Sequence, residues 1–415
     1  MSRFHHGWLV AAVLFMTFAL TIGITQYSFG VFVTELEADL GWNRAGINGA
    51  LTLFAVGGLL APVVGRLIDR HGSRPVMMAS FALLAVSHLA RPWVTELWQF
   101  YALSFVQFAA IPGTIMLPAG KLLAIWFPTA RGRAMGFTSM GANVGGATFS
   151  ALSALLIGRL GWEGTYAVYG VVFLVAIPIV ALVIREDGRP VVEGAPPPPK
   201  ADGLTTREAM RTRAFYIIVI SLTLAQLQYL SVLTQIVPHL ENVGFSRGTA
   251  ATALGGMAVF GAMGKVSFGW LTERVPSRYV VMLSLGMQVV GLAILVRAGD
   301  SGAMWTFVPV FGLGFGAMGA LMTLFVQETF GIRAFATIFG LVNFFTQGAS
   351  IVGPPLVGAS FEATGGYELA FTTIAVLFVV AAAFVFFAAP PKRPPPSEED
   401  VDAELRVRPV AVEAS

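Results

Sequence analysis

A lysine inside a long apolar segment is the residue of this sequence whose setting most strongly indicates chemistry. Lys265 lies within AVFGAMGKVSFGW, with Gly261 and Gly264 beside it and no carboxylate one helical turn away on either side. In a membrane span, an ammonium group at this depth costs at least about 2.5 kcal/mol unless it faces a cavity or a partner. We therefore predict that Lys265 binds an anion, either a side chain of another helix or a solute. The alternative is that its side chain extends to the nearer membrane surface.

The composition favours membrane spans. The chain is 56% hydrophobic and 12% charged, with a mean hydropathy of +0.74, whereas a soluble domain is about 25% charged. Repeated runs of about 20 apolar residues are each long enough to cross the hydrocarbon core of a bilayer. The chain has no cysteine, which excludes disulfides and thiolate metal sites. Its basic residues are scattered among loops, so the pI of about 9.3 indicates membrane topology rather than nucleic-acid binding.

Twelve apolar segments predict an all-α integral membrane protein made of two six-helix bundles. A segment with four consecutive prolines and a basic end separates the bundles. The expected divisions are an N-terminal bundle (1–184), a cytoplasmic linker (185–213), a C-terminal bundle (214–389) and a disordered cytoplasmic tail (390–415). The expected spans are 8–33, 45–68, 75–92, 97–126, 132–158, 163–184, 214–239, 248–270, 279–297, 303–327, 333–359 and 367–389.

One charged loop occurs twice at a fixed spacing. The first copy is GRLIDRHGSR at 65–74, between two long apolar segments. Moving 204 residues along the chain turns Gly65, Asp69, Arg70 and Arg74 into Gly269, Glu273, Arg274 and Arg278, and carries Gly136 onto Gly340 and Gly161 onto Gly365. We infer an internal duplication, in which the counterpart of Lys265 is the neutral Ala61.

The distribution of positive charge predicts the orientation in the membrane. Eighteen Lys and Arg residues fall on the face that holds both termini, the linker and both charged loops, and five fall on the opposite face. Because cytoplasmic loops carry the excess of Lys and Arg, both termini are expected in the cytoplasm. The first apolar run is too long for a signal peptide and is taken as the first span. We expect a multi-pass protein of a bacterial plasma (inner) membrane.

The spacing G-x-x-x-D-R-x-G-x-R at 65–74 resembles the signature loop between helices 2 and 3 of major facilitator superfamily transporters. The resemblance implies the twelve-helix major facilitator fold and alternating access to a central site. It also implies that both loop copies, together with basic residues at neighbouring helix ends, form a gate that closes the cytoplasmic side. The expected gating residues are Gly65, Asp69, Arg70, Arg74, Gly269, Glu273, Arg274, Arg278, Lys121, Arg131 and Arg133.

A narrower resemblance is to monocarboxylate transporters and the related oxalate/formate exchangers. It is carried by His6-Gly7-Trp8, Gly41-Trp42-Asn43-Arg44, Gly120-Lys121 and the stretch GKVSFGWLTE at 264–273. That stretch is similar to the family's helix 8, in which a membrane-embedded Arg binds the substrate carboxylate, and Lys265 falls on this Arg. Lys would bind as a point charge rather than as a bidentate guanidinium. Animal members also carry a proton-accepting Asp one turn earlier, where this chain has Gly261.

Other polar residues inside the spans are candidates for the same site. Because helices 1, 4, 7, 10 and 11 line the central cavity in this superfamily, we expect substrate contacts from polar side chains there and on helix 5. Hydrogen bonds between helices are the alternative role for each of them. Glu328, near the end of the tenth span, is either part of a gate ion pair or a protonation site. The predicted substrate-binding residues are Lys265, Tyr27, Asn143, Tyr229, Asn343 and Gln347.

The sequence therefore predicts a secondary transporter of a small organic monocarboxylate, driven by coupling to protons. Exchange of organic anions is the first alternative, and a transporter-like sensor or a carrier of a neutral solute is the second. An enzyme is not expected, because the sequence shows no cofactor motif, metal cluster or nucleophile with a base. The expected partners are the organic anion, protons and the lipid bilayer, with no cofactor, catalytic residue, metal, nucleic acid or obligate protein partner.

Overall fold

The computed structural model describes residues 3–186, 203–297 and 301–388, and these are helical apart from turns and one isolated bridge between Gly203 and Gly331. The predicted all-α fold is confirmed. The first half contains α1 (Arg3–Ile22), α2 (Phe29–Leu40), α3 (Arg44–Gly49), α4 (Phe54–His71), α5 (Ser73–Leu89), α6 (Leu97–Ala110), α7 (Met116–Trp126) and α8 (Arg131–Val183). The second contains α9 (Thr206–Met210), α10 (Arg213–Asn242), α11 (Arg247–Leu271), α12 (Ser277–Val296), α13 (Ser301–Phe330), α14 (Phe335–Thr364) and α15 (Glu368–Phe387).

The described helices fit the twelve expected spans. Nine described helical stretches are long and apolar enough to cross a membrane, and α10 and α14, each of 30 residues, add two more. The stretch α8 counts twice, because Gly161 interrupts its 53 residues with a left-handed φ of 72°. Gly365, the counterpart of Gly161 in the repeat, ends α14 with a φ of 74°. Both copies of the duplication therefore use glycine to end the same helix.

The first expected span is not one uninterrupted helix. A π-helical turn at Gly23–Tyr27 separates α1 from α2. Gly23 packs there against α8, where a Cβ would lie 2.6 Å from the carbonyl oxygen of Gly145. The close approach of the two helices requires a residue without a side chain at this position. Apolar composition alone could not distinguish this turn from a regular helix.

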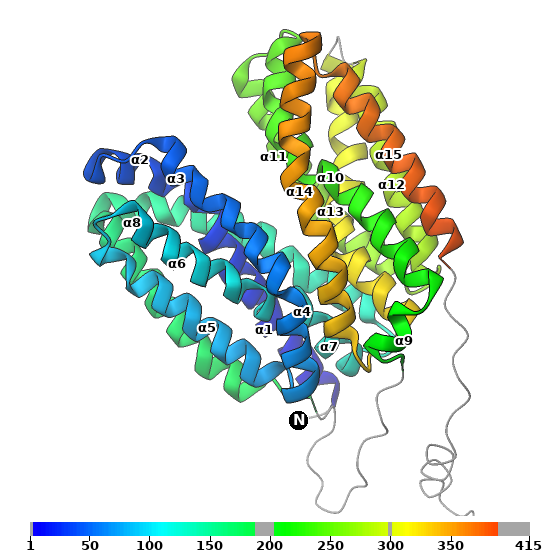
Figure 1. Cartoon of the computed structure of the whole chain (residues 1–415), viewed down its shortest axis with the longest axis horizontal. Coiled ribbons are helices and arrows are strands. Elements are labelled where there is room, and N and C mark those ends of the chain that lie inside the picture. The colour runs from blue at the N-terminus through cyan, green and yellow to red at the C-terminus, as the bar shows by residue number, and fades with distance from the viewer. Residues whose placement is uncertain (1–2, 187–202, 298–300, 389–415) are drawn as a thin grey trace, which may run out of the picture.

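The helices form two bundles that meet at one end of the molecule (Figure 1). One hydrophobic core is built mainly by α1 to α8 and the other mainly by α10 to α15. The two bundles meet near the N-terminus and α9, while α2 and α3 diverge from the far end of α11 (Figure 1). We call the end that carries both charged loops, 65–74 and 269–278, the loop end. The bundles contact each other at the loop end and along the adjoining turns of their helices.

Two equivalent helix pairs join the bundles, α4 with α14 and α8 with α11. In each pair a glycine allows the backbones to touch. A Cβ on Gly136 would lie 2.2 Å from the carbonyl oxygen of Lys265, and a Cβ on Gly340 would lie 2.4 Å from that of Ala61. Real Cβ atoms essentially never come this close to a carbonyl oxygen, so only glycine fits. The offset of 204 residues relates these contacts, which means that the duplication is present in the packing as well as in the sequence.

Candidate functional site

Lys265 lies between the two bundles, on α11, with its ammonium group directed at α8. Its Nζ donates hydrogen bonds to the carbonyl oxygen of Ser139, at 3.1 Å, and to Oδ1 of Asn143. Asn143 in turn donates from Nδ2 to the carbonyl oxygen of Ala258, at 3.1 Å. No carboxylate pairs with Lys265 among the described residues, so the charge is solvated by neutral oxygens alone. Lys265 and Asn143, both predicted to bind the substrate, are in contact in the structure, and that role stays a prediction.

The Lys265 side chain points towards the middle of the bundle and away from the nearer helix ends. Lys265 lies six residues before Leu271, the last residue of α11, which is about 9 Å along the helix. Its partner Asn143 lies twelve residues after Arg131, the first residue of α8, which is about 18 Å from the same end. A lysine that extended to the membrane surface would point the other way. The geometry therefore favours a central role over a surface one.

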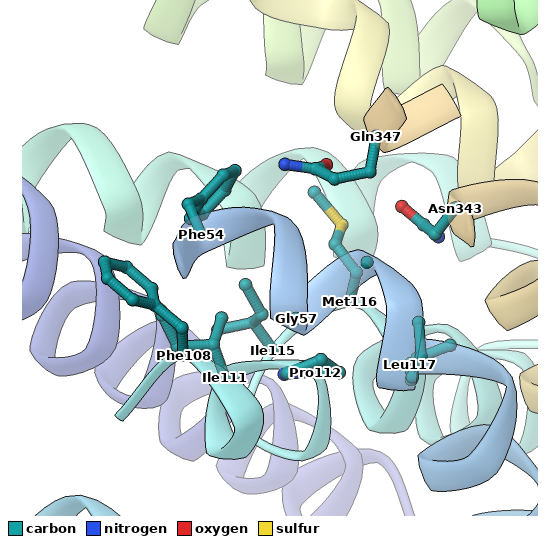
Figure 2. Close-up of a pocket in the computed structure, with 12 residues that line it drawn as sticks. Phe54, Gly57, Phe108, Ile111, Pro112, Ile115, Met116, Leu117, Asn343 and Gln347 are labelled. Carbon is teal, nitrogen blue, oxygen red and sulfur yellow. The ribbon is translucent and has the colours of Figure 1, made fainter. Parts of the chain in front are cut away.

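Asn343 and Gln347 lie away from Lys265, at the α4–α14 contact, where they line a cavity of about 100 Å³ (Figure 2). Asn343 donates from Nδ2 to the carbonyl oxygen of Phe339 on its own helix, at 2.9 Å. Nε2 of Gln347 is buried and has no hydrogen-bond partner within the part of the chain that the structure describes. The rest of the wall is mainly apolar and includes Phe54 and Phe108. The two carboxamides are thus the main polar groups of an otherwise apolar cavity.

Of the two tyrosines predicted to bind the substrate, the structure describes the side chain of Tyr27 and not that of Tyr229. Tyr27 ends the π-helical turn, and its side chain is 50% exposed and lies against Gly146 of α8. Its contact Gly146 lies fifteen residues after Arg131, about midway between the start of α8 and its break at Gly161. Tyr229 lies in α10, but its side chain is outside the described residues.

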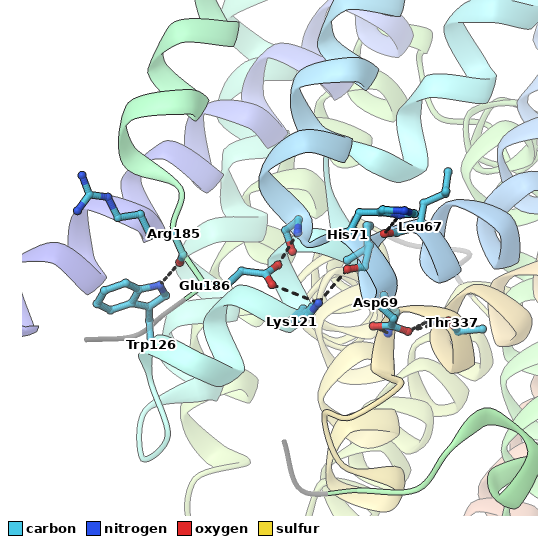
Figure 3. A network of polar contacts seen from close by, with 11 residues as sticks. Leu67, Asp69, His71, Lys121, Trp126, Arg185, Glu186 and Thr337 are labelled. Atoms are coloured by element: carbon cyan, nitrogen blue, oxygen red, sulfur yellow. Dashed lines mark hydrogen bonds and ion pairs between the residues drawn. The ribbon is translucent and has the colours of Figure 1, made fainter. Parts of the chain in front are cut away.

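The acidic residue of each charged loop holds the start of a helix in the other bundle. Asp69 accepts hydrogen bonds from the backbone nitrogens of Ala336 and Thr337, at 3.3 and 2.8 Å, and from the hydroxyl of Thr337 at 2.7 Å. These nitrogens belong to the first turn of α14, where helix N–H groups lack partners and a negative charge is favourable. Figure 3 shows this contact. Asp69 thereby joins α4 to α14 at the loop end.

Glu273 forms the corresponding contact between α11 and α8. It accepts a hydrogen bond from the backbone nitrogen of Arg133, at 2.9 Å. It also forms an ion pair with the Arg133 guanidinium, at 2.8 Å. Arg133 is in the first turn of α8, as Thr337 is in the first turn of α14. Both loop carboxylates therefore bind a helix start of the opposite bundle. Their predicted part in gating stays a prediction.

Lys121 connects α7 to the same region. Its Nζ donates to the carbonyl oxygen of Ile68, at 2.9 Å, and lies 3.3 Å from Glu186, a carboxylate that also accepts from the backbone nitrogen of Ser73 (Figure 3). Trp126 donates from its indole nitrogen to the carbonyl oxygen of Arg185. The side chain of Lys121 is 13% exposed, and that of Glu186 is 28% exposed. Lys121 has a carboxylate partner and so differs from Lys265.

A family model describes the same architecture. The model of the Major Facilitator Superfamily matches residues 12–354. The chain belongs to the major facilitator superfamily. Among the most similar relatives, monocarboxylate transporter 13 of Bos taurus is 25% identical over 368 residues, covering 88% of this chain and 85% of the relative. Human monocarboxylate transporter 11 is 26% identical over 379 residues, covering 88% and 79%. The predicted resemblance to this superfamily and to monocarboxylate transporters is confirmed.

Solved structures of major facilitator transporters share the fold. The fucose:proton symporter FucP of E. coli superimposes with a TM-score of 0.70 at 13% identity, covering 94% of this chain and 100% of the other. The human organic anion transporter MFSD10 (TETRAN) gives a TM-score of 0.69 at 16% identity, covering 91% and 99%. With the family model, these matches make the chain a multi-pass membrane transporter and not an enzyme, as predicted.

The basic residues of the two loops do not pair with the loop acids of this major facilitator protein. The Arg274 guanidinium lies 3.6 Å from the ring centre of Trp270, and that of Arg278 donates to the hydroxyl of Tyr279. No ion pair within 4 Å joins Arg70 or Arg74 to Asp69 in the described ranges. Arg131 has a buried Nε with no hydrogen-bond partner among the described residues. Their predicted part in gating stays a prediction.

Glu328 of this transporter is exposed and caps a helix. Its Oε2 accepts from the backbone nitrogen of Ser277, at 2.8 Å, at the start of α12. Ionisable residues that carry protons inside membrane proteins face the bundle interior or a water-filled cavity, whereas the described contact of Glu328 is with the start of α12. The structure assigns it a structural contact, and its part in proton coupling stays a prediction.

Several residues that shape the site of this transporter were not singled out from the sequence. Ser139 contributes a backbone oxygen, which its side chain does not reveal. Thr337 and Glu186 act at helix starts that only the three-dimensional arrangement brings near the charged loops. The offset of 204 residues did contain one further signal, because it carries Ser139 onto Asn343 and Asn143 onto Gln347.

Proposed function

We propose that this transporter moves a small organic monocarboxylate across the membrane together with protons, and that Lys265 binds the carboxylate. The observation that carries the proposal is a lysine between the two bundles whose described partners are the neutral oxygens of Ser139 and Asn143. Neutral oxygens solvate an ammonium group but leave its charge uncompensated. A bound carboxylate would supply that compensation, and the names of the monocarboxylate transporter relatives support this class of solute.

The position of Lys265 suits a site that both bundles share. Lys265 is on α11 and its partners are on α8, so movement of one bundle relative to the other changes the surroundings of the ammonium group. A carboxylate that replaces Asn143 as a partner would take part in that rearrangement. Hydrogen bonds to charged groups contribute about 1.5 to 3 kcal/mol, which is enough to shift an equilibrium between two conformations.

We further propose that the loop end faces the cytoplasm of a bacterial cell, on the ground of the excess of Lys and Arg there. Residues 1–184 and 214–389 would then move as two bodies, with 185–213 as the linker. The contacts of Asp69 with α14 and of Glu273 with α8 would hold the conformation that is open to the outside. Breaking them would release the solute into the cell.

Uptake into liposomes that contain the purified protein tests the proposal. Radiolabelled L-lactate, pyruvate, acetate and oxalate are offered with and without an inward proton gradient, to the wild type, Lys265→Met and Lys265→Arg. We expect gradient-stimulated uptake of at least one monocarboxylate. Lys265→Met, which keeps a long side chain but removes the charge, should lower it by about 10- to 100-fold. Lys265→Arg should keep part of it, because the charge remains.

Arg44→Ala provides the matched control for loss of a positive charge. Arg44 pairs with Glu37 at 2.6 Å, and both side chains are exposed, so its removal should leave uptake unchanged within a factor of two. Uptake that requires liposomes preloaded with an anion would instead assign the protein as an organic-anion exchanger. Normal uptake by Lys265→Met, or no uptake of any carboxylate by the wild type, would contradict the proposal.

A further inference from the structure

The cavity at the α4–α14 contact occupies the position in the repeat that corresponds to the Lys265 site. The offset of 204 residues carries Ser139 and Asn143, the partners of Lys265, onto Asn343 and Gln347, and it carries Ala61 onto Lys265 itself. All three counterparts, Ala61, Asn343 and Gln347, line the cavity. The backbones around both places make the same contacts, through Gly136 at one and Gly340 at the other. The cavity is therefore the second copy of the site, with a methyl group in place of the lysine side chain.

The second copy differs from the first in charge and in space. No charged side chain of the described residues lines the cavity, whereas the first copy contains an ammonium group. Alanine leaves open the volume that a lysine side chain would fill. Gly58 of the same helix lets Gln347 pack against the backbone, where a Cβ would lie 2.4 Å from the Gln347 side chain. The walls formed by Phe54, Phe108 and their neighbours are apolar, as Figure 2 shows. Such a cavity accepts an uncharged group and excludes a second carboxylate, which would be buried without a cation.

The two carboxamides leave hydrogen-bonding capacity directed at this space. Nε2 of Gln347 is a buried donor with no partner among the described residues. Asn343 uses Nδ2 for the carbonyl oxygen of Phe339, so its Oδ1 remains an acceptor. Figure 2 shows both amide groups beside the apolar wall. An uncharged chain with an oxygen atom would satisfy these groups, and a buried donor left without a partner costs about 1 to 3 kcal/mol.

We propose that this cavity is a second solute subsite, which holds the uncharged tail of the monoanion whose carboxylate Lys265 binds. The inference rests on the proposed function and adds the class of substrate, a carboxylate with a branched or extended apolar tail. The two subsites lie at the same depth, since Asn143 is twelve residues into α8 and Gln347 is twelve residues into α14. A dicarboxylate would meet a cation at one subsite only.

Filling the cavity tests the inference. Uptake of acetate and of 4-methyl-2-oxopentanoate into liposomes is compared for the wild type, Ala61→Leu and the control Val63→Leu. Ala61 is 2% exposed and lines the cavity, whereas Val63 lies on the same helix and is 57% exposed. Since one methylene in an apolar pocket changes discrimination by about 10-fold or more, Ala61→Leu should lower the ratio of the branched acid to acetate by about tenfold. Val63→Leu should leave the ratio unchanged.

Gln347→Ala enlarges the same cavity and covers the case in which Ala61→Leu does not fold. We expect the ratio of 3-phenyl-2-oxopropanoate uptake to acetate uptake to rise several-fold in this variant. Equal changes for all acids in both variants would overturn the inference and leave the proposed function standing, because the residues would then act on the transport cycle alone. A wild type that carries acetate but no acid with a longer tail would also overturn it. If Lys265→Met removes no carboxylate transport, the proposed function fails, and this inference fails with it.

Discussion

The two helix pairs that join the bundles are alike in packing and opposite in chemistry. At α8–α11, Gly136 lies against the backbone of Lys265, and the ammonium group is held by Asn143. At α4–α14, Gly340 lies against the backbone of Ala61, and the side chain that would correspond to the lysine is a methyl group. What both copies share is required by the fold, since each bundle must meet the other closely. What only one copy has is a candidate for the site.

The loop carboxylates follow the shared pattern. Asp69 and Glu273 each accept a backbone N–H from the first turn of a helix in the opposite bundle, namely α14 and α8. Because the two contacts have the same geometry, we infer that Asp69 and Glu273 have the same mechanical role. The equivalent residues Ala61 and Lys265 have instead diverged in charge. Under the proposed function, the duplication separates the contacts that close the loop end, present twice, from the residue that binds charge, present once.

The glycines of the shared contact should be equally important in both copies. A side chain at position 136 or 340 would place a Cβ within 2.4 Å of a backbone carbonyl oxygen, so the helices must separate. We expect Gly136→Val and Gly340→Val each to lower uptake by about 100-fold or more, with the protein still inserted in the membrane. Liposome uptake, with the amount of inserted protein measured alongside, checks this. Gly30→Val, at a position with no atom near its Cβ, is the control.

A strong loss in one variant of this pair and normal transport in the other would contradict the separation, because the shared packing would then matter at one contact only. A loss in Gly30→Val as large as in the others would mean that the assay reports general damage to the fold rather than closure.

Restoring the missing charge should make the two copies more alike. Ala61→Lys places an ammonium group within reach of Asn343 and Gln347, which correspond to the partners of Lys265. We expect succinate uptake to rise about tenfold relative to monocarboxylate uptake, because the second carboxylate then pairs with a cation in the cavity. Competition between labelled monocarboxylate and unlabelled dicarboxylate measures the shift. An unchanged preference would show that the cavity does not contact the solute.

Much of this architecture follows from the sequence. The apolar runs give the helices, and the repeated loop gives the duplication, because both depend on local composition and spacing. The divergence of Lys265 from Ala61 was visible in the same way. The partners of Lys265 were less accessible, since Ser139 acts through its backbone. The cavity could not be predicted at all, because an empty volume depends on how α4, α7 and α14 pack. The π-helical turn at Gly23–Tyr27 also depends on packing, against Gly145.

The two loop carboxylates should differ in strength despite their shared geometry. Asp69 accepts three hydrogen bonds from Ala336 and Thr337, whereas part of the Glu273 contact is an ion pair with Arg133, whose side chain is 54% exposed. Loss of a capping carboxylate costs about 0.5 to 2 kcal/mol, and an exposed ion pair about 0 to 1 kcal/mol. Asp69→Ala should therefore shift the conformational equilibrium by about 2- to 30-fold, and more than Glu273→Ala.

A single introduced thiol measures this shift, because the chain has no cysteine of its own. Leu324 of α13 packs into the core of the first bundle, so a cysteine there is shielded while the loop end is closed. Labelling of Leu324→Cys by a water-soluble maleimide should be faster in the Asp69→Ala background than in the Glu273→Ala background. Equal labelling rates in Leu324→Cys alone and in both double variants would show that these carboxylates do not hold the loop end closed.

The smallest effects are expected at two equivalent helix starts, one in each half, where a glutamate accepts a hydrogen bond from the backbone nitrogen of a serine. Ser73 and Ser277 are related by the offset of 204, and their backbone nitrogens donate to Glu186 and Glu328 respectively. Glu186 also pairs with the nearly buried Lys121, whereas Glu328 is exposed. Gln keeps an oxygen that accepts the backbone hydrogen bond but removes the charge. Glu328→Gln should therefore change uptake by less than about twofold, and Glu186→Gln should cost more because Lys121 loses its carboxylate.

Glu328→Gln also decides whether this carboxylate carries protons. If Glu328 only caps α12, the stimulation of uptake by an inward proton gradient should survive the substitution, because no step of the cycle then requires its protonation. If the stimulation disappears while uptake without a gradient is retained, Glu328 is the coupling residue, and its exposed capping geometry must be exchanged for a buried one during the cycle. Retained stimulation would exclude Glu328 as the coupling residue and leave the proposed pairing between the solute carboxylate and Lys265 as the next place to test, since no carboxylate pairs with that ammonium group in the described part of the chain.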